Sequence, residues 1–240
     1  MPMARVWLKK ARNRLQARSA AVRVEVLSGY AQWAKAYPAE AHNPLMEIEQ
    51  RAMFRLLPPV KGKMCLDLAC GSGRYLRLLR EQGAGQVFGS DYSAEMLAQA
   101  RLTNPEIGLV RCPFLALPFA TESFDLITCA LGVGHEANLH CLLAEAGRLL
   151  RPGGSLLYSD FHPFAALNGW QRTFIANGIT FSLEHYIHLY ADHLHACRAA
   201  DLTIEAVLEP AGGPHAPAQF ARLPVVLVIR AVKNSRGTPA

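Results

Sequence analysis

Two acidic residues with a glycine-rich turn between them have the residue types and the spacing of a ligand-binding site. Asp67 lies near the end of a short apolar run, Gly71 and Gly73 follow it, and Asp91 closes the next apolar run. Small residues let the backbone approach a ligand closely, and a helix beginning after the turn presents unpaired N–H groups. Asp91 could accept two hydrogen bonds from a ribose diol. The pattern therefore predicts a ligand at this turn.

Two common nucleotide-binding motifs do not fit this turn. The dinucleotide fingerprint G-x-G-x-x-G would need its third glycine where this chain has Leu76, and no Lys-Ser or Lys-Thr pair follows the glycines as a P-loop requires. The acid and the open backbone suit an amino-acid-like or sulfonium group better than a pyrophosphate. An NAD-dependent oxidoreductase is therefore a weaker hypothesis.

Histidines supply the candidate acid–base and metal-binding groups. His135 and His162 each follow a predicted strand, where either could serve as a general base; a loop histidine that only makes hydrogen bonds is the ordinary alternative. A denser group contains His185, His188, Asp192, His193 and His195. Spacing alone is poor evidence for zinc or iron, so we expect no metal and assign this group to polar substrate contacts or solvent.

The elements that must position these residues alternate between strands and helices. Strands are predicted at residues 64–68, 86–90, 107–111, 123–132, 155–159, 203–208 and 225–232. Helices are predicted between them at residues 74–81, 94–101, 138–150 and 192–201. Strand–helix–strand connections of this length imply parallel pairing with right-handed crossovers. Both acids then lie at the carboxyl edge of the sheet, where open α/β sheets bind ligands.

Two segments fall outside this alternation. Residues 22–37 predict a helix with Tyr30, Trp33 and Tyr37 near one face, and residues 44–57 predict a second amphipathic helix. Residues 161–190 are rich in aromatic residues and histidine, and they are inserted at the expected ligand edge. They are composed like a substrate lid, with a peripheral hairpin or an oligomer contact as the alternative. The lid residues expected at the substrate are Trp170, His185, Tyr186 and His188.

Charge is concentrated at the start of the chain. Seven of the 25 Lys and Arg residues lie in residues 1–24, which contain no acid, leaving 18 cations against 19 acidic residues elsewhere. A broad nucleic-acid surface is therefore not expected. The basic segment resembles an organellar transit peptide or a surface-bound amphipathic helix, but we favour an ordinary cytoplasmic helix or a frayed tail.

Cysteine usage and hydropathy indicate the compartment. The six cysteines occur singly, with no C-x-x-C pair, which favours buried thiols in a reducing cytosol. No apolar run approaches the roughly 18 residues that a bilayer span needs, and the start lacks the apolar core of a secretory signal. We therefore expect a cytoplasmic monomer or homodimer with one main domain and no membrane span.

Four motifs then occur in the order and spacing of a known enzyme family. They are DLACGSG at residues 67–73, GSDYSAEM at 89–96, LPF at 117–119 with SFD at 123–125, and RLLRPGG at 148–154. Over residues 61–160 the chain resembles the class I S-adenosylmethionine-dependent methyltransferases of the small-molecule type, methyltransferase domain 11. The resemblance implies an α/β, Rossmann-like, doubly wound sheet of seven mostly parallel strands with a reversed last strand.

The resemblance also implies a division of the chain. Residues 1–60 would form a helical extension and cap, and residues 61–240 the methyltransferase domain with its lid insertion at 161–190. The cofactor would be S-adenosyl-L-methionine and its product S-adenosyl-L-homocysteine. The residues expected to contact it are Tyr37, Asp67, Ala69, Cys70, Gly71, Gly73, Asp91, Tyr92, Met96, Pro113, Phe114 and Ala130.

One position departs from the family. The turn after the third strand usually carries an Asp that accepts from the adenine amino group, whereas this chain has Cys112, Pro113 and Phe114. Pro113 has no backbone N–H to donate. Adenine would therefore be held by packing against Pro113 or Phe114 and by backbone groups.

The implied activity is methyl transfer to a small-molecule acceptor, with O or N favoured over C, by in-line displacement in a dry site. His135 and His162 are the candidate bases. An Asn-Pro-Pro-Tyr-type motif for exocyclic base nitrogens is missing, since residues 130–133 read ALGV. Two alternatives stay open: an RNA methyltransferase anchored by the basic segment, and a non-catalytic module that binds S-adenosylmethionine.

Overall fold

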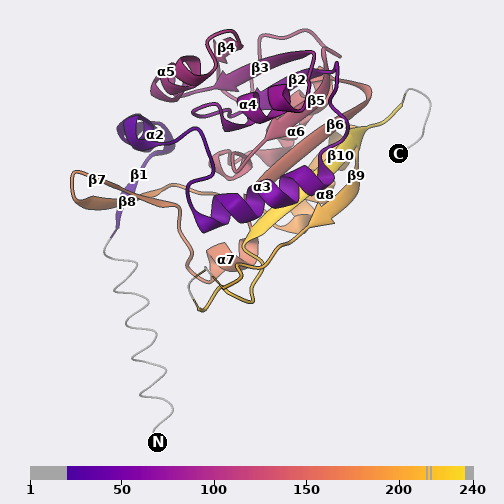
Figure 1. Cartoon of the computed structure of the whole chain (residues 1–240). Helices are drawn as coiled ribbons and strands as arrows, with labels where there is room; N and C mark the ends of the chain where they lie inside the picture. Colours follow the sequence, from indigo (N-terminus) through magenta and orange to yellow (C-terminus); the bar gives the residue numbers. More distant parts are fainter. Residues whose placement is uncertain (1–20, 215, 217, 236–240) are drawn as a thin grey trace, which may run out of the picture.

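Seven strands form the central sheet, in the order β4-β3-β2-β5-β6-β10-β9. In the computed structural model, which describes residues 21–214, 216 and 218–235, helices cover both faces of this sheet (Figure 1). Neighbouring strands from β4 through β6 are parallel, and β10 runs antiparallel to both β6 and β9. The predicted fold class is therefore confirmed. Of the basic segment, residues 1–20 lie outside the described residues.

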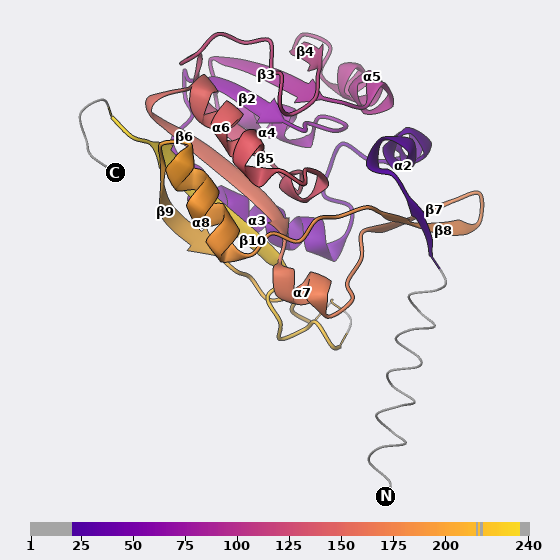
Figure 2. The same ribbon diagram turned by 180° about the vertical axis from the view of Figure 1, so that it is seen from behind.

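The elements follow the predicted alternation closely. The strands of the sheet are β2 Met64–Leu68, β3 Gln86–Asp91, β4 Gly108–Arg111, β5 Phe124–Cys129, β6 Leu150–Phe161, β9 Leu202–Leu208 and β10 Val226–Lys233. The helices that cover it are α3 Pro44–Leu56, α4 Arg74–Glu81, α5 Ala94–Thr103, α6 Leu139–Leu149 and α8 Tyr190–Ala199. Helices α3 and α4 lie on one face, and α6 and α8 on the opposite face (Figures 1 and 2).

The helix α6 ends before residues 151–154 as predicted, but the predicted start of the next strand at Ser155 is wrong. The structure assigns these residues to β6, which begins at Leu150 rather than at Ser155. The partner of Phe124 on β5 is Leu150, but the partner of Leu126 is Ser155, so the strand accommodates extra residues between them. Gly153 adopts a φ of 77° there, a conformation that glycine reaches without strain.

The predicted helix over residues 22–37 is only partly correct. Residues Val22–Val24 form strand β1, which pairs in parallel with β8 Ile179–Leu183, and helix α2 spans Val26–Trp33, followed by a 3₁₀ turn η1 at Ala34–Ala36. The alternating Val-Arg-Val suits a strand, because β-branched residues pack well on a pleated surface. The aromatic residues that suggested a longer helix lie on α2 and just after η1.

The insertion and the chain start share one small sheet. Helix α7 spans Pro163–Leu167, and β7 Thr173–Ala176 pairs antiparallel with β8. The order β1-β8-β7 makes a three-stranded sheet that extends from the main body beside α2 (Figure 1). The 161–190 insertion is thus fixed to the segment before residue 60, so the proposed cap and lid are one structural unit.

A buried ion pair and its hydrogen bonds join the three elements α3, α4 and β6. The side chain of Glu49, on α3, has no solvent exposure, and its Oε2 lies 2.8 Å from Nη1 of Arg74 at the start of α4. The Tyr75 hydroxyl donates to Glu49 Oε1 over 3.1 Å, and the Ser159 hydroxyl on β6 donates to the same oxygen over 2.7 Å. A buried charge is tolerated only when it is paired and hydrogen-bonded in this way.

We expect Glu49→Gln to lower the free energy of unfolding by about 3 kcal/mol or more, because the buried guanidinium of Arg74 would lose its charged partner. The measurement is urea unfolding followed by circular dichroism. Glu47→Gln on the same helix is the matched control: that carboxylate is exposed, and its loose contact with Arg51 predicts a change of about 0.5 kcal/mol or less. Equal effects of the two substitutions would contradict the role assigned to Glu49.

Candidate functional site

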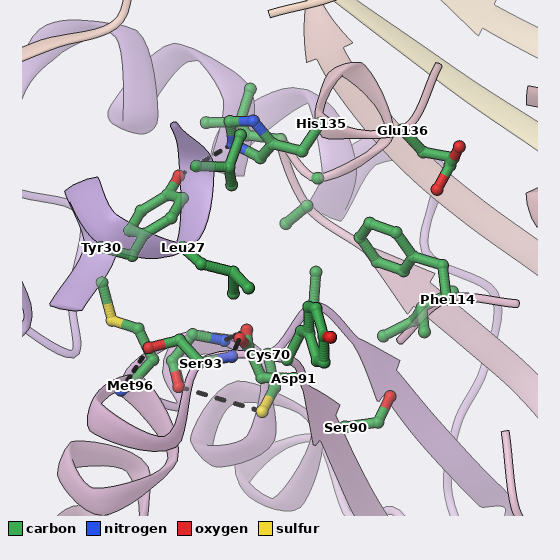
Figure 3. Close-up of a pocket in the computed structure, with 18 of the residues that line it drawn as sticks. Leu27, Tyr30, Cys70, Ser90, Asp91, Ser93, Met96, Phe114, His135 and Glu136 are labelled. Carbon is green, nitrogen blue, oxygen red and sulfur yellow. Dashed lines mark hydrogen bonds between the residues drawn. The ribbon is translucent and has the colours of Figure 1, made fainter. Parts of the chain in front are cut away.

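A cavity of about 340 Å³ lies at the carboxyl ends of β2, β3 and β5. Its lining comes from the glycine turn, the strand ends, helix α2 and the insertion. Figure 3 shows Leu27, Met96 and Phe114 around the same space as Asp91. This volume lies in the range of small-molecule binding sites. The cavity is therefore the candidate site, and the residues selected from the sequence are expected in its lining.

Most of those residues line the cavity. They are Tyr37, Asp67, Ala69, Cys70, Gly71, Asp91, Tyr92, Met96, Pro113, Phe114, Ala130, His135 and Tyr186. Parallel pairing explains the convergence, because β2 pairs with both β3 and β5 and their carboxyl ends meet at one edge. The assignment of these residues to a particular ligand stays a prediction.

The glycine turn exposes backbone to the cavity. Gly71 and Gly73 have φ values of 54° and 94°, and Ala69, with a φ of 56°, is one of the few non-glycine residues in the left-handed region. A Cβ added to Gly71 would meet nothing within 4 Å, so its backbone faces open space. Gly73 instead packs against α5, where a Cβ would collide with the Asn104 side chain. Gly71 thus gives a ligand access, while Gly73 permits close packing behind it.

Asp67 is buried at the base of the turn. Its side chain is 1% exposed, and the Thr128 hydroxyl on β5 donates to its Oδ1 over 2.7 Å. Burial raises the pKa of Asp67 to about 7, against a smaller lowering by the Thr128 hydrogen bond. A pKa near 7 means that both the protonated and the ionised form of this carboxyl are populated near neutral pH.

Asp91 is held in a fixed orientation at the end of β3. Its Oδ2 accepts from the Gly71 N–H and its Oδ1 from the Ser93 N–H, each over 2.8 Å. Burial raises its pKa, while these backbone hydrogen bonds act in the opposite direction. A carboxylate has about four lone-pair positions, so it can still accept from two hydroxyls of a ligand. Ser90 also borders the cavity, but its hydroxyl oxygen is buried and has no hydrogen-bond partner among the described residues.

The region beyond Asp91 is apolar. Met96, Pro113 and Phe114 contribute to the cavity wall, and the N–H of Cys112 is already bound to the carbonyl of Asp91 over 3.1 Å. A planar ring of a ligand could therefore pack against the turn at residues 112–114 but would find few hydrogen-bonding groups there. This agrees with the absence of a carboxylate there in the sequence.

At the opposite end of the cavity, His135 contacts two residues that sequence reasoning did not place in the site. Nδ1 of His135 lies 3.3 Å from the carbonyl of Glu184, so it carries the proton, and Nε2 accepts. Nη1 of Arg172 lies 2.7 Å from that Nε2, and the Tyr30 hydroxyl lies 3.0 Å from it (Figure 3). Burial, and then the Arg172 charge, hold the pKa of His135 well below its usual range. His135 is therefore neutral, and its basic nitrogen is engaged.

The remaining selected histidines lie outside the cavity lining. His162 caps α7 by accepting from the Phe164 N–H, and its Nε2 lies 3.0 Å from Glu209. His188 bonds to the carbonyl of Glu136 over 2.8 Å. His185 lies 3.9 Å from Asp160, but burial lowers the pKa of His185 to about 3, so this contact is not an ion pair.

Trp170 also packs away from the cavity, against Phe220 and Phe161. Within the described part of the chain, no group of three or more His, Cys, Asp or Glu side chains could hold a metal ion. None of the helices there is long and apolar enough to cross a bilayer.

Sequence reasoning missed several cavity residues. They are Glu25, Leu27, Tyr30, Arg74, Glu136, Arg172 and Glu184. Tyr30 was identified only as part of an aromatic stripe, and its spacing did not show which side of the helix would face a ligand. Arg172 carries no sequence signal, because tertiary contacts such as the pairing of β8 with β1 bring the insertion over the sheet edge.

Comparison with known proteins agrees with this site. Residues 66–158 match the family model of the methyltransferase domain, and they contain the turn, both acids and the first of the two candidate bases. These residues are therefore a methyltransferase domain. The chain has the fold of the class I S-adenosylmethionine-dependent methyltransferases, as its motifs implied.

Individual relatives extend the comparison. The chain is 40% identical over 109 residues to a 2-phytyl-1,4-naphtoquinone methyltransferase from Trichormus variabilis, covering 42% of this chain and 48% of that protein. It is 32% identical over 149 residues to a demethylmenaquinone methyltransferase from Beutenbergia cavernae, covering 58% of this chain and 62% of that protein. Curated relatives such as these are matched over about half to three fifths of their length.

A solved structure matches over nearly its whole length. An S-adenosylmethionine dependent methyltransferase from Mesorhizobium loti superposes with a TM-score of 0.66 at 26% identity, covering 77% of this chain and 97% of that one. The agreement in fold therefore extends beyond residues 66–158, which the family model matches.

The raised pKa of Asp67 predicts a pH-dependent stability. The ordinary pKa of 3.8 becomes about 7 in the folded protein, so between pH 4 and 7 the folded state retains a proton that the unfolded chain releases. The contribution of Asp67 to stability therefore falls as pH rises through this window. Asp67→Asn removes the ionisation. We expect the unfolding free energy of this variant, relative to wild type, to increase by about 1 kcal/mol or more from pH 5 to pH 8.

Urea unfolding at several pH values provides the measurement. Asp201→Asn is the control, because that exposed carboxyl has a lowered pKa and does not titrate between pH 5 and pH 8. A difference between Asp67→Asn and wild type that stays constant with pH would show that Asp67 is ionised throughout the range.

Proposed function

We propose that this chain transfers a methyl group from S-adenosyl-L-methionine to a small-molecule acceptor. The observation that supports this most strongly is the single cavity that joins the Asp67–Gly71 turn and Asp91 to the residues of α2 and the insertion. One end of that cavity has the donors and acceptors for an amino-acid and ribose unit. The other end has aromatic and charged side chains that suit an acceptor.

The residues present fit such a cofactor. In this proposal the open backbone at Gly71 and the Asp67 carboxyl hold the amino-acid end, and Asp91 holds the ribose hydroxyls through its free lone pairs. Met96 and Phe114 would enclose the adenine ring, which fits the apolar character of that wall. Gly73 contributes through the position of α4 rather than through contact.

When bound, the cofactor supplies an electrophilic methyl carbon, to which the acceptor atom bonds as the carbon–sulfur bond breaks and sulfur keeps the electron pair. The chain's own residues then need mainly to align the acceptor and exclude water. His135 positions Arg172 and Tyr30 through its engaged Nε2 rather than presenting a free base. His162 lies outside the cavity lining, so a role for it would require a rearrangement of its contact with Glu209. An acceptor that is already an anion would need neither base.

The names of the relatives guide the choice of acceptor. Two act on quinones by name, and a malonyl-[acyl-carrier protein] O-methyltransferase from Enterobacter lignolyticus is 34% identical over 120 residues. We therefore propose a cyclic or carboxylate-bearing acceptor, with oxygen or nitrogen favoured as the methylated atom. A cytoplasmic location and a monomeric or homodimeric state stay predictions from the sequence.

Calorimetric titration of the full chain tests the cofactor. We expect micromolar affinity for S-adenosylmethionine and S-adenosylhomocysteine and no binding of NAD. Asp91→Asn should lose at least about 10-fold in affinity, because hydrogen bonds to a charged acceptor contribute about 1.5–3 kcal/mol. Asp201→Asn, in which an exposed acid far from the cavity is changed, should bind like wild type.

The same preparations separate the alternatives. An RNA methyltransferase would bind RNA with an affinity that falls steeply with salt and disappears when residues 1–24 are deleted. A binding module would bind S-adenosylmethionine but methylate none of the acceptors offered. Absence of binding by wild type would overturn the proposed function.

A further inference from the structure

A buried arginine is the cavity group that the methyl-transfer chemistry leaves unexplained. Arg172 precedes β7 in the insertion, is 9% exposed and lines the cavity. Its Nη1 donates to the Tyr30 hydroxyl over 2.6 Å and to Nε2 of His135 over 2.7 Å, and its Nη2 donates to the carbonyl of Leu131 over 2.7 Å. All three acceptors are neutral. A guanidinium has five N–H groups, so two of them, on Nε and Nη2, have no acceptor among the described residues.

The other cavity cation has its own counterion, and Arg172 does not. Arg74 is paired with Glu49 over 2.8 Å. No carboxylate oxygen of the described residues lies within 4.0 Å of an Arg172 nitrogen, although five acidic side chains line the cavity. Asp160 acts on Arg172 only at longer range, and burial raises the pKa of Asp160 to about 7, so it neutralises the guanidinium only in part.

A buried cation without a paired anion costs several kcal/mol, and a structural role alone would be filled as well by a neutral donor. The guanidinium is also fixed in direction. It stacks over the Phe161 ring at 4.8 Å, and its two free N–H groups belong to a rigid planar fork that matches a carboxylate or another oxyanion. The wall of the cavity combines aromatic and aliphatic side chains, among them Tyr186 and Leu27, with acidic ones such as Glu136 and Glu184.

We propose that Arg172 is the acceptor-recognition residue of this cavity, binding an anionic oxygen on an otherwise apolar, ring-sized acceptor. The anion is either a carboxylate or an ionised phenol or quinol oxygen, and the guanidinium is its counterion. This inference rests on the proposed function, because it names the substrate class of the same site. It also explains how an acceptor could react without a free base: the guanidinium stabilises the deprotonated form of an oxygen that then needs no proton removal.

Matched charged and neutral probes test this proposal. Calorimetry on the full chain saturated with S-adenosylhomocysteine would compare 2-naphthoate with its neutral analogue 2-naphthamide. We expect wild type to favour the carboxylate by at least about 10-fold, since a charged hydrogen-bonded contact contributes about 1.5–3 kcal/mol. Arg172→Met should abolish that preference while S-adenosylhomocysteine affinity changes less than about threefold. Arg198→Met, on the exposed face of α8, is the control and should keep the preference.

A second arm distinguishes the two kinds of anion. The visible absorbance of 4-nitrophenol reports its ionised fraction, so an oxyanion site would bind it more ionised in wild type than in Arg172→Met. A carboxylate-only site would favour naphthoate without this spectral change. Either result supports a counterion role for Arg172.

Three results would have different meanings. If 2-naphthoate binds wild type no more tightly than 2-naphthamide, or if neither binds, while S-adenosylhomocysteine still binds, this inference is wrong and the proposed function stands. Equal weakening of both probes in Arg172→Met, with the preference retained, would make Arg172 a structural tether. Failure of wild type to bind S-adenosylhomocysteine would overturn the proposed function itself. If Arg172→Met does not fold, the wild-type preference and the Arg172→Lys variant decide.

Discussion

The buried carboxylate of Glu49 is the interaction on which the arrangement of the site depends. It lies outside the motifs, on the helix before the first core strand, yet it receives hydrogen bonds from Arg74, Tyr75 and Ser159. Those residues begin α4 and end β6. Since a buried charge must satisfy its lone pairs, the positions of α3, α4 and β6 relative to one another are fixed together.

The same network extends to the acceptor end of the cavity. The Ser159 hydroxyl, bound to Glu49, also accepts from the Leu131 N–H over 2.9 Å, and the Leu131 carbonyl accepts from Arg172. Leu131 has a φ of 54°, a conformation that is unfavourable for a branched residue. Hydrogen bonds on both sides of this residue stabilise the strained backbone. The turn after β5 is thus held between the hydrogen-bond network around Glu49 and the guanidinium of Arg172.

Much of this structure could be predicted because the relevant signals are local. Short apolar runs predicted the strands, and segments with helical spacing between them predicted the helices that cover the sheet. The parallel order of the strands then placed Asp67 and Asp91 at one edge. The errors also have local causes. The sequence of Val22–Val24 is compatible with the start of a helix, because three residues show too little periodicity to distinguish a strand from a helix. The glycines at residues 153–154 suggested a stop, although β6 passes through them with a shifted register.

The acceptor end could not be predicted, because its residues come together only through tertiary pairing. Tyr30, His135 and Arg172 are separated by 105 and 37 positions, and no spacing rule relates them. A histidine at a strand end was a reasonable candidate base, but burial and then the charge of Arg172 lower its pKa, and Arg172 also occupies its lone pair. That arginine reaches the site through tertiary contacts of the insertion, among them the pairing of β8 with β1. Two of these three residues, Tyr30 and Arg172, thus come from segments outside residues 66–158, and such segments are where proteins that share a fold can differ in what they bind.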